Sequence, residues 1–189
     1  MRAVLLRLGL LLLAVDLRAG ASRSAEQSVF LFENRRVAVV LPEGFGLATT
    51  KDERGLLTVR IANPADTANL QITFVPDSDG QLASSRGRME LMVGAFQAYV
   101  EGSVEKAMQF EELQPRTGSG TFCTFTDAKL VGKAEVPPGE FRCVSAGVKA
   151  WPGVGAVFSL FSQDPRGREH QALLALLRES VVEKPVPLK

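Results

Sequence analysis

Leu70-Gln71-Ile72-Thr73-Phe74-Val75 sets the pattern on which the fold prediction rests, because apolar and polar side chains alternate along it. A period of two places Leu70, Ile72 and Phe74 on one face of a strand, and the polar residues between them on the other. The stretch therefore predicts a half-buried strand in a sheet.

Runs rich in β-branched and aromatic residues extend this pattern in both directions. The further predicted strands are 29–32, 36–41, 56–61, 106–113, 121–129, 140–149 and 154–162. Turn sequences separate them, with 33–35 and 63–66 the clearest in the first half.

In two segments the apolar residues recur at spacings of three and four positions, which is the pattern of a helix. A long helix is predicted within 81–104, and its apolar stripe consists of Met89, Met92, Val93, Phe96, Tyr99 and Val100. A second helix is predicted from Asp164, as the cap, and Pro165 to a stop before Pro185. The order of strands, helix, strands and helix predicts one α+β domain over 28–183, with disordered segments at 22–27 and 184–189.

The first 21 residues match a secretory signal peptide. Basic residues precede a short apolar run, and Ala19-Gly20-Ala21 forms a small-residue cleavage site. The apolar run is shorter than the about 20 residues that span a bilayer, so no membrane span is expected in the mature chain. We expect export to the periplasm, with secretion as the alternative, and a mature chain that begins near Ser22.

Cys123 and Cys143 are the only cysteines of the chain, and an exported protein meets oxidising conditions. A disulfide between them predicts an antiparallel pair in which Phe125 opposes Phe141 and Thr121 opposes Ser145. We interpret the pair as structural, because a redox role usually needs a Cys-x-x-Cys motif or a low-pKa thiolate at a helix N-terminus.

Charge argues against nucleic-acid binding. Without the three arginines and one aspartate of residues 1–21, the 22 basic and 21 acidic side chains become 19 and 20. The mature chain is nearly neutral, and it therefore has no basic field that would concentrate a polyanion.

Individual reactive side chains do not form a recognisable site. His170, the only histidine, is expected to be a solvated helix residue, and no Gly-x-Ser-x-Gly elbow or set of zinc ligands accompanies it. Met89 and Met92 suit Cu(I) in principle, but their place on the apolar stripe favours core packing. The remaining charged groups are expected on solvated faces, namely Arg86, Arg88, Glu111, Glu112, Arg166 and Arg168. We therefore expect no catalytic, metal or cofactor residues.

The chain resembles the PsbP/DcrB-like family over most of 28–183. The resemblance rests on Leu41-Pro42-Glu43-Gly44-Phe45 after a strand, a central helix that ends near Tyr99, a meander with a Gly-rich turn and a terminal amphipathic helix. It implies an α/β/α sandwich with a curved antiparallel sheet, and a non-enzymatic accessory or binding role in the bacterial envelope. Members share no catalytic residues, and the cysteine pair departs from the family pattern.

Two classes of function follow. The favoured one is a non-enzymatic periplasmic accessory or binding protein that holds an envelope protein partner. The alternative is an enzyme or inhibitor-type protein whose site folding assembles from distant residues, for example Glu111, Arg142, Lys149 and His170.

Overall fold

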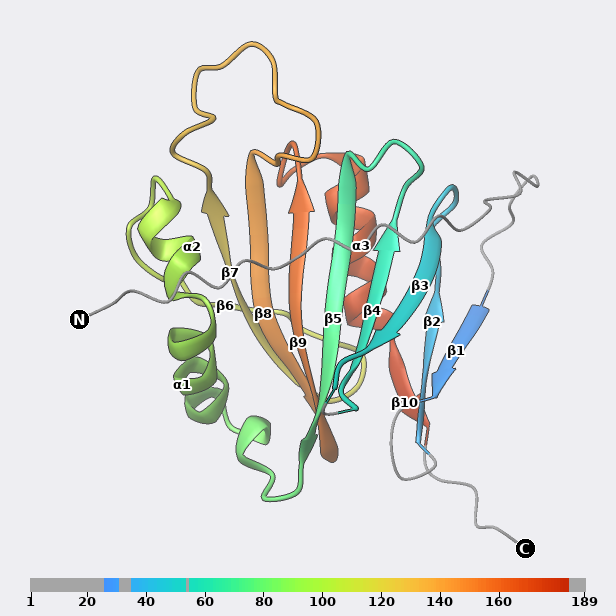
Figure 1. Ribbon diagram of the computed structural model, residues 1–189. Helices are drawn as coiled ribbons and strands as arrows, with labels where there is room; N and C mark the ends of the chain where they lie inside the picture. Colours follow the sequence, from blue (N-terminus) through green and yellow to red (C-terminus); the bar gives the residue numbers. More distant parts are fainter. Residues whose placement is uncertain (1–25, 31–34, 54, 184–189) are drawn as a thin grey trace, which may run out of the picture.

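The computed structural model describes residues 26–30, 35–53 and 55–183. Within them the chain forms two antiparallel sheets and three α-helices, with most of the ordered residues in strands (Figure 1). The α+β prediction is confirmed. The predicted signal peptide and the tail 184–189 lie outside the described residues, whereas Glu26 and Gln27, expected in a disordered segment, begin the first strand.

Seven strands form the large sheet, and all neighbours in it are antiparallel. In spatial order they are β3 (Gly46–Lys51), β4 (Leu57–Ala62), β5 (Ala68–Asp77), β9 (Gly153–Ser162), β8 (Cys143–Trp151), β7 (Ser119–Thr126) and β6 (Glu111–Glu112). The strands β5, β9 and β8 are the longest and lie at the centre of the sheet.

One face of this sheet, called here the α3 face, holds the main core. It is covered by α3 (Arg168–Glu179) and by the small sheet of β1 (Glu26–Phe30), β2 (Arg36–Val40) and β10 (Val181–Glu183). Leu70, Ile72 and Phe74 are buried in this core, while Gln71 is exposed on the opposite face. The alternation in β5 is therefore confirmed.

The opposite face, called here the α1 face, is covered only in part. A 3-10 turn at Gln81–Ala83, α1 (Ser85–Ala95) and α2 (Gln97–Gly102) lie beside β7 and β8 (Figure 1). A second apolar cluster forms there around Met92, Phe96 and Phe125. Over β4 and β5 the same face is polar, with a hydrogen bond between the hydroxyls of Thr58 and Thr73 (2.9 Å).

The long helix predicted within 81–104 is two helices. Phe96 leaves the helical conformation (φ −116°, ψ 15°) and separates α1 from α2, because its side chain turns into the second cluster. Only Met92 and Phe96 of the predicted stripe are fully buried, and Val93 is 52% exposed.

Arg88 was predicted to be solvated and is instead 3% exposed. Its guanidinium donates to Thr121 Oγ1 (2.9 Å), Ser119 Oγ (2.8 Å) and two carbonyls of the preceding turn. These bonds satisfy the buried charge and attach α1 to β7.

The second predicted helix is shorter than expected. Asp164 caps a turn rather than the helix, since its carboxylate accepts from the Arg166 N–H (2.8 Å), and α3 begins only at Arg168. The chain leaves the helix after Glu179 because residues from Val181 pair with β2. Strands β3 and β10 were not predicted, and the predicted strand 106–113 is reduced to Glu111–Glu112.

The predicted disulfide between Cys123 and Cys143 is wrong: both cysteines are free and buried. In the observed register Cys123 opposes Ala146 and Cys143 opposes Thr126, three residues away from the predicted pairing. An odd shift moves side chains to opposite faces of a sheet. Cys123 therefore lies in the α1-face cluster, whereas Cys143 faces α3, and the two sulfurs cannot meet.

The same register corrects the expected neighbours. Phe125 opposes Val144, not Phe141, and Thr121 opposes Val148, not Ser145.

We predict that protein isolated without reductant and then unfolded exposes two free thiols per chain, because the two cysteines project from opposite faces. Thiol titration in denaturant measures this number. A count of zero with a chain of unchanged monomer mass would contradict the observed register.

Gly147 in β8 allows the closest packing on the α3 face. A Cβ at this position would lie 2.6 Å from Phe122 Cβ and 2.7 Å from Phe158 Cζ, and it would also meet the Thr121 carbonyl. Real Cβ atoms do not approach so closely, so a larger residue must displace the sheet.

Gly147→Ala is predicted to lower the free energy of unfolding by about 1–3 kcal/mol, the usual cost of overpacking a core. Gly94→Ala is the matched control, because nothing lies within 4 Å of its Cβ and alanine favours the helix, by up to about 1 kcal/mol. Urea unfolding of both variants gives the comparison. Equal stabilities of the two variants would contradict this packing.

Candidate functional site

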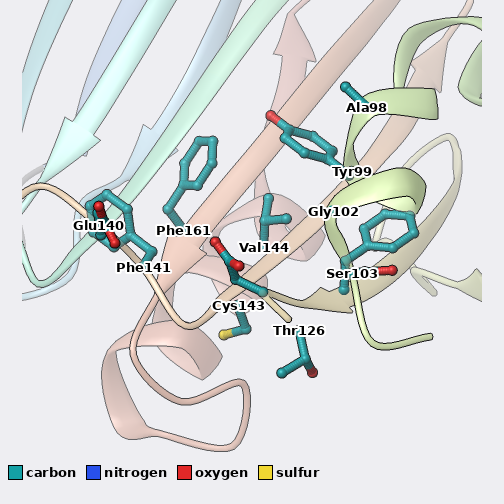
Figure 2. Close-up of a pocket in the computed structure, with 12 residues that line it drawn as sticks. Ala98, Tyr99, Gly102, Ser103, Thr126, Glu140, Phe141, Cys143, Val144 and Phe161 are labelled. Carbon is teal, nitrogen blue, oxygen red and sulfur yellow. The ribbon is translucent and has the colours of Figure 1, made fainter. Parts of the chain in front are cut away.

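An aromatic pocket of about 250 Å³ opens on the α1 face, between α2 and the connection from β7 to β8. We call it the aromatic pocket and define it by its lining: Ala98, Tyr99, Gly102, Ser103, Phe125, Thr126, Asp127, Glu140, Phe141, Cys143, Val144 and Phe161. Figure 2 shows Tyr99 on one side, Phe141 and Glu140 on the other, and Phe161 between them.

The floor of the aromatic pocket is a row of side chains across three strands. Phe125 of β7 opposes Val144 of β8, which in turn opposes Phe161 of β9. Residues opposed in neighbouring strands share a face, so this row is a direct consequence of the sheet register.

Four aromatic rings surround the space. The Tyr99 centroid lies 6.1 Å from that of Phe125 and 6.2 Å from that of Phe161, the second pair being edge to face. Phe141 lies 5.5 Å from Phe161. These separations are those of aromatic pairs in contact, which makes the wall continuous.

Backbone bonds hold the wall in place. The Ala128 N–H donates to the Gly102 carbonyl (3.1 Å) and the Val104 N–H donates to the Thr126 carbonyl (2.9 Å), so the end of α2 is joined to the end of β7. The Tyr99 hydroxyl and Ser159 Oγ are 3.2 Å apart, which fixes the tilt of that ring.

The polar part of the lining is acidic. Among the described residues, the lining contains the acids Asp127 and Glu140 and no lysine, arginine or histidine. Asp127 accepts from the Lys129 N–H (2.8 Å), and Arg142 donates to the carbonyls of Leu130 (2.9 Å) and Lys133 (2.7 Å), which orders the β7–β8 connection.

Glu105, in the segment after α2, adds a third acid near the pocket. Burial raises its pKa, but the bond from the Thr126 N–H (2.9 Å) and further hydrogen bonds outweigh burial and lower the pKa. Glu105 is therefore ionised at neutral pH.

On the α3 face directly behind the pocket lies a chain of buried polar groups. His170 Nδ1 is 2.8 Å from Ser162 Oγ, and His170 Nε2 is 3.0 Å from Ser145 Oγ. Ser145 Oγ continues to Thr124 Oγ1 (2.7 Å), and Ser162 Oγ to Cys143 Sγ (3.1 Å).

One arrangement of protons satisfies every group in this chain. The thiol of Cys143 donates to the Ser162 carbonyl and the Ser162 hydroxyl donates to the Asp164 carbonyl. His170 Nδ1 then donates to Ser162 Oγ, while Nε2 accepts from Ser145. This arrangement requires a neutral imidazole with no carboxylate partner.

The prediction that His170 is solvated is therefore wrong, since it is 1% exposed. His170 lies on the side of α3 that faces the sheet, where the hydroxyls of Ser145 in β8 and Ser162 in β9 contact its ring nitrogens. Burial lowers the pKa of His170 to about 4, with a small opposing effect of Asp164.

Burial also raises the pKa of the Cys143 thiol, and that of Cys123 to about 11. Both thiols are therefore protonated and poorly nucleophilic at neutral pH.

Lys149 is another buried basic residue, and it lies at the C-terminal end of α3. It is 0% exposed, and its Nζ donates to the carbonyls of Leu177 (2.6 Å) and Ser180 (2.7 Å). The Trp151 ring lies 4.4 Å from Nζ. Burial lowers the pKa of Lys149 to about 7, while Glu179 opposes this. The contacts are those of a residue that caps the C-terminal end of a helix.

The four residues suggested for an assembled site do not come together. Glu111 and His170 border one polar hollow of about 490 Å³ between β7 and α3, but Arg142 lies in the β7–β8 connection and Lys149 lies under the end of α3. Met92 is buried in the second cluster, as expected for core packing. The same prediction is wrong for Met89, which is only half-buried and lines a separate shallow hollow. Glu111, Glu112, Arg86, Arg166 and Arg168 are exposed, as predicted.

The described residues contain no group of three or more His, Cys, Asp or Glu placed to hold a metal ion, and none of their helices is long and apolar enough to cross a membrane. A scan against protein-family models and searches of curated proteins and solved structures found no match. The resemblance to the PsbP/DcrB-like family therefore stays a prediction.

The sequence did not reveal the aromatic pocket. The sequence pattern places Tyr99 on a helix stripe and Phe125 opposite Phe141, and it indicates no more for Phe161 than a place in a predicted strand. The available signal was the density of aromatic residues in three predicted strands, yet only the register brings them into one row.

His170 makes stability sensitive to acid. Its folded pKa of about 4 lies below the unfolded value of 6.5, so between these values the unfolded chain binds the proton that the folded protein excludes. The contribution is fully present above pH 6.5 and is lost as the pH falls toward 4. We predict that the wild type loses about 2–3 kcal/mol more than His170→Gln between pH 7.5 and pH 4.5.

Urea unfolding of both proteins at the two pH values measures this difference. Glutamine is chosen because its amide can bond to both serine hydroxyls but does not titrate. Parallel pH profiles for the two proteins would contradict a neutral buried His170.

Proposed function

We propose that this protein is a non-enzymatic binding or accessory protein of the bacterial envelope, and that its ligand enters the aromatic pocket. The observation that carries the proposal is the pocket itself: an apolar concave site with a few polar groups at its border is the usual form of a binding site. Export, by the signal-peptide pattern of residues 1–21, supports the location in the envelope.

The attachment of the pocket wall to its floor supports binding as well. Its floor belongs to the three strands β7, β8 and β9, and its wall is tied to them by the backbone bonds of Ala128 and Val104. A preformed site loses little conformational entropy when a ligand enters, which favours affinity.

The enzymatic alternative has one structural feature in its favour. This feature is the series of side-chain contacts that runs from Thr124 through Ser145, His170 and Ser162 to Cys143. Ser145 and Ser162 are buried, however, and His170 has no carboxylate to orient it as a general base. A satisfied, neutral chain of this kind supports a structural role, so binding is the function we favour.

The family resemblance supports the same proposal. The sheet with α3 on one face and α1 and α2 on the other fits the α/β/α sandwich that the resemblance implies. The resemblance also implies an accessory role without shared catalytic residues.

The experiment is photocrosslinking in the intact envelope. Ala98, an exposed lining residue of α2, is replaced by p-benzoylphenylalanine, and adducts are read by gel shift and intact mass. Ala175, an exposed alanine on α3, is the matched control. We predict an adduct of defined mass from position 98 that is absent from position 175. No adduct, or the same adducts from both positions, would reject binding at the aromatic pocket.

A further inference from the structure

We propose that the aromatic pocket binds a soluble quaternary ammonium compound, a small cation of the choline class. The inference rests on the proposed function, because it names the chemical class of the group that enters the same site. It is carried by three observations: the arrangement of the rings, the charge of the lining and the size of the cavity.

The rings provide the recognition surface. Tyr99, Phe125, Phe141 and Phe161 come from four different segments and all line the cavity. The edge-to-face arrangement of Tyr99 and Phe161 directs ring faces in different directions, as does the tilt of Phe141 against Phe161 (44°). Aromatic faces attract a cation through their negative quadrupole, and cages of such rings recognise methylated ammonium groups.

Charge complementarity selects a cation over a neutral apolar group. In the part of the chain that the structure describes, Asp127 and Glu140 are the charged residues of the lining, and neither is basic. In the neighbouring segments, Arg142 bonds to the Leu130 and Lys133 carbonyls and Lys106 bonds to the Glu101 carbonyl (2.7 Å), so these hydrogen bonds hold both side chains to the backbone. The ionisable groups of the described lining are therefore acidic, which favours a cation beside the rings.

Away from its two carboxylates, the apolar part of the lining favours a methylated over a primary ammonium. Ser103 Oγ already donates to the Val100 carbonyl (3.0 Å) and accepts from the Lys106 N–H (3.2 Å). A primary ammonium in this apolar space needs three acceptors to replace its water, whereas a trimethylammonium group needs none.

The size of the cavity favours a small solute. Its volume of about 250 Å³ is below the range of about 300–1,000 Å³ in which pockets for drug-sized ligands fall. A trimethylammonium group with a short polar chain suits this space, with the chain directed toward Glu140 at the border.

Isothermal titration calorimetry of the full mature protein with three probes tests the inference. The probes are choline, its neutral isostere 3,3-dimethylbutan-1-ol and the primary amine ethanolamine. Choline is expected to bind at least about tenfold more tightly than either, since cation–π attraction in a desolvated site is of that order. Equal binding of the neutral isostere or of ethanolamine would overturn the inference.

Phe141→Leu and Phe161→Leu keep apolar volume but remove a ring face, so each is expected to weaken choline binding about tenfold. Phe110→Leu is the matched control, because Phe110 is exposed and lines a different hollow. Thermal unfolding shows which variants are folded, and two ring variants keep the test decisive if one fails. Wild-type affinity in a folded ring variant would overturn the inference.

Glu140→Gln is expected to weaken choline binding about twofold or more. Glu43→Gln is its control, because Glu43 is an exposed acid outside the pocket.

The last measurement compares binding of the protein to phosphatidylcholine vesicles with its binding to phosphatidylglycerol vesicles. Tighter binding to phosphatidylcholine vesicles than to free choline would overturn the assignment to a soluble compound.

The two proposals fail separately. A pocket-specific adduct from position 98 without choline binding would reject the cation and keep the binding function. Choline binding that survives in Phe141→Leu and Phe161→Leu would place it outside the pocket and reject the cation site alone. The absence of any position-98 adduct would instead reject the binding function in the envelope.

Discussion

The register of β7, β8 and β9 is the constraint on which the rest of the structure depends. On the α1 face it aligns Phe125, Val144 and Phe161 into the floor of the aromatic pocket. On the α3 face it places Ser145 and Ser162 where both nitrogens of His170 reach them. A slip of one residue in either pairing would exchange the faces and destroy both arrangements at once.

Strand β8 also holds α3 at two points. Ser145 contacts His170 near the start of the helix, and Lys149 contacts the carbonyls near its end. From Ser145 to Lys149 a strand rises about 13 Å, and from His170 to Arg178 a helix rises about 12 Å. The two lengths match, so side chains from one strand satisfy polar groups at both ends of the helix. Burial then lowers the pKa values of both His170 and Lys149.

Local pattern was a good guide to element type and a poor guide to contacts between elements. The alternation around Leu70 and Phe74 and the hydrophobic run in α3 correctly indicated a strand and a helix. The burial of polar side chains is harder to predict from sequence. Arg88 and His170 resemble solvated helix residues in sequence, yet they lie on inward faces and bond to buried partners. The break at Phe96 was also hidden, since its apolar ring fits a continuous helical stripe.

The sequence by itself determined the α+β class, the order of most strands and helices, and which face of β5 is buried, because these depend on short-range periodicity. Only the tertiary structure decided the register of β7 and β8. This register differs by three residues from the predicted one, so Cys123 and Cys143 lie on opposite faces of the sheet and form no disulfide. The aromatic pocket was decided in the same way. Its rings come from α2, two strands and the β7–β8 connection, and only packing brings them together.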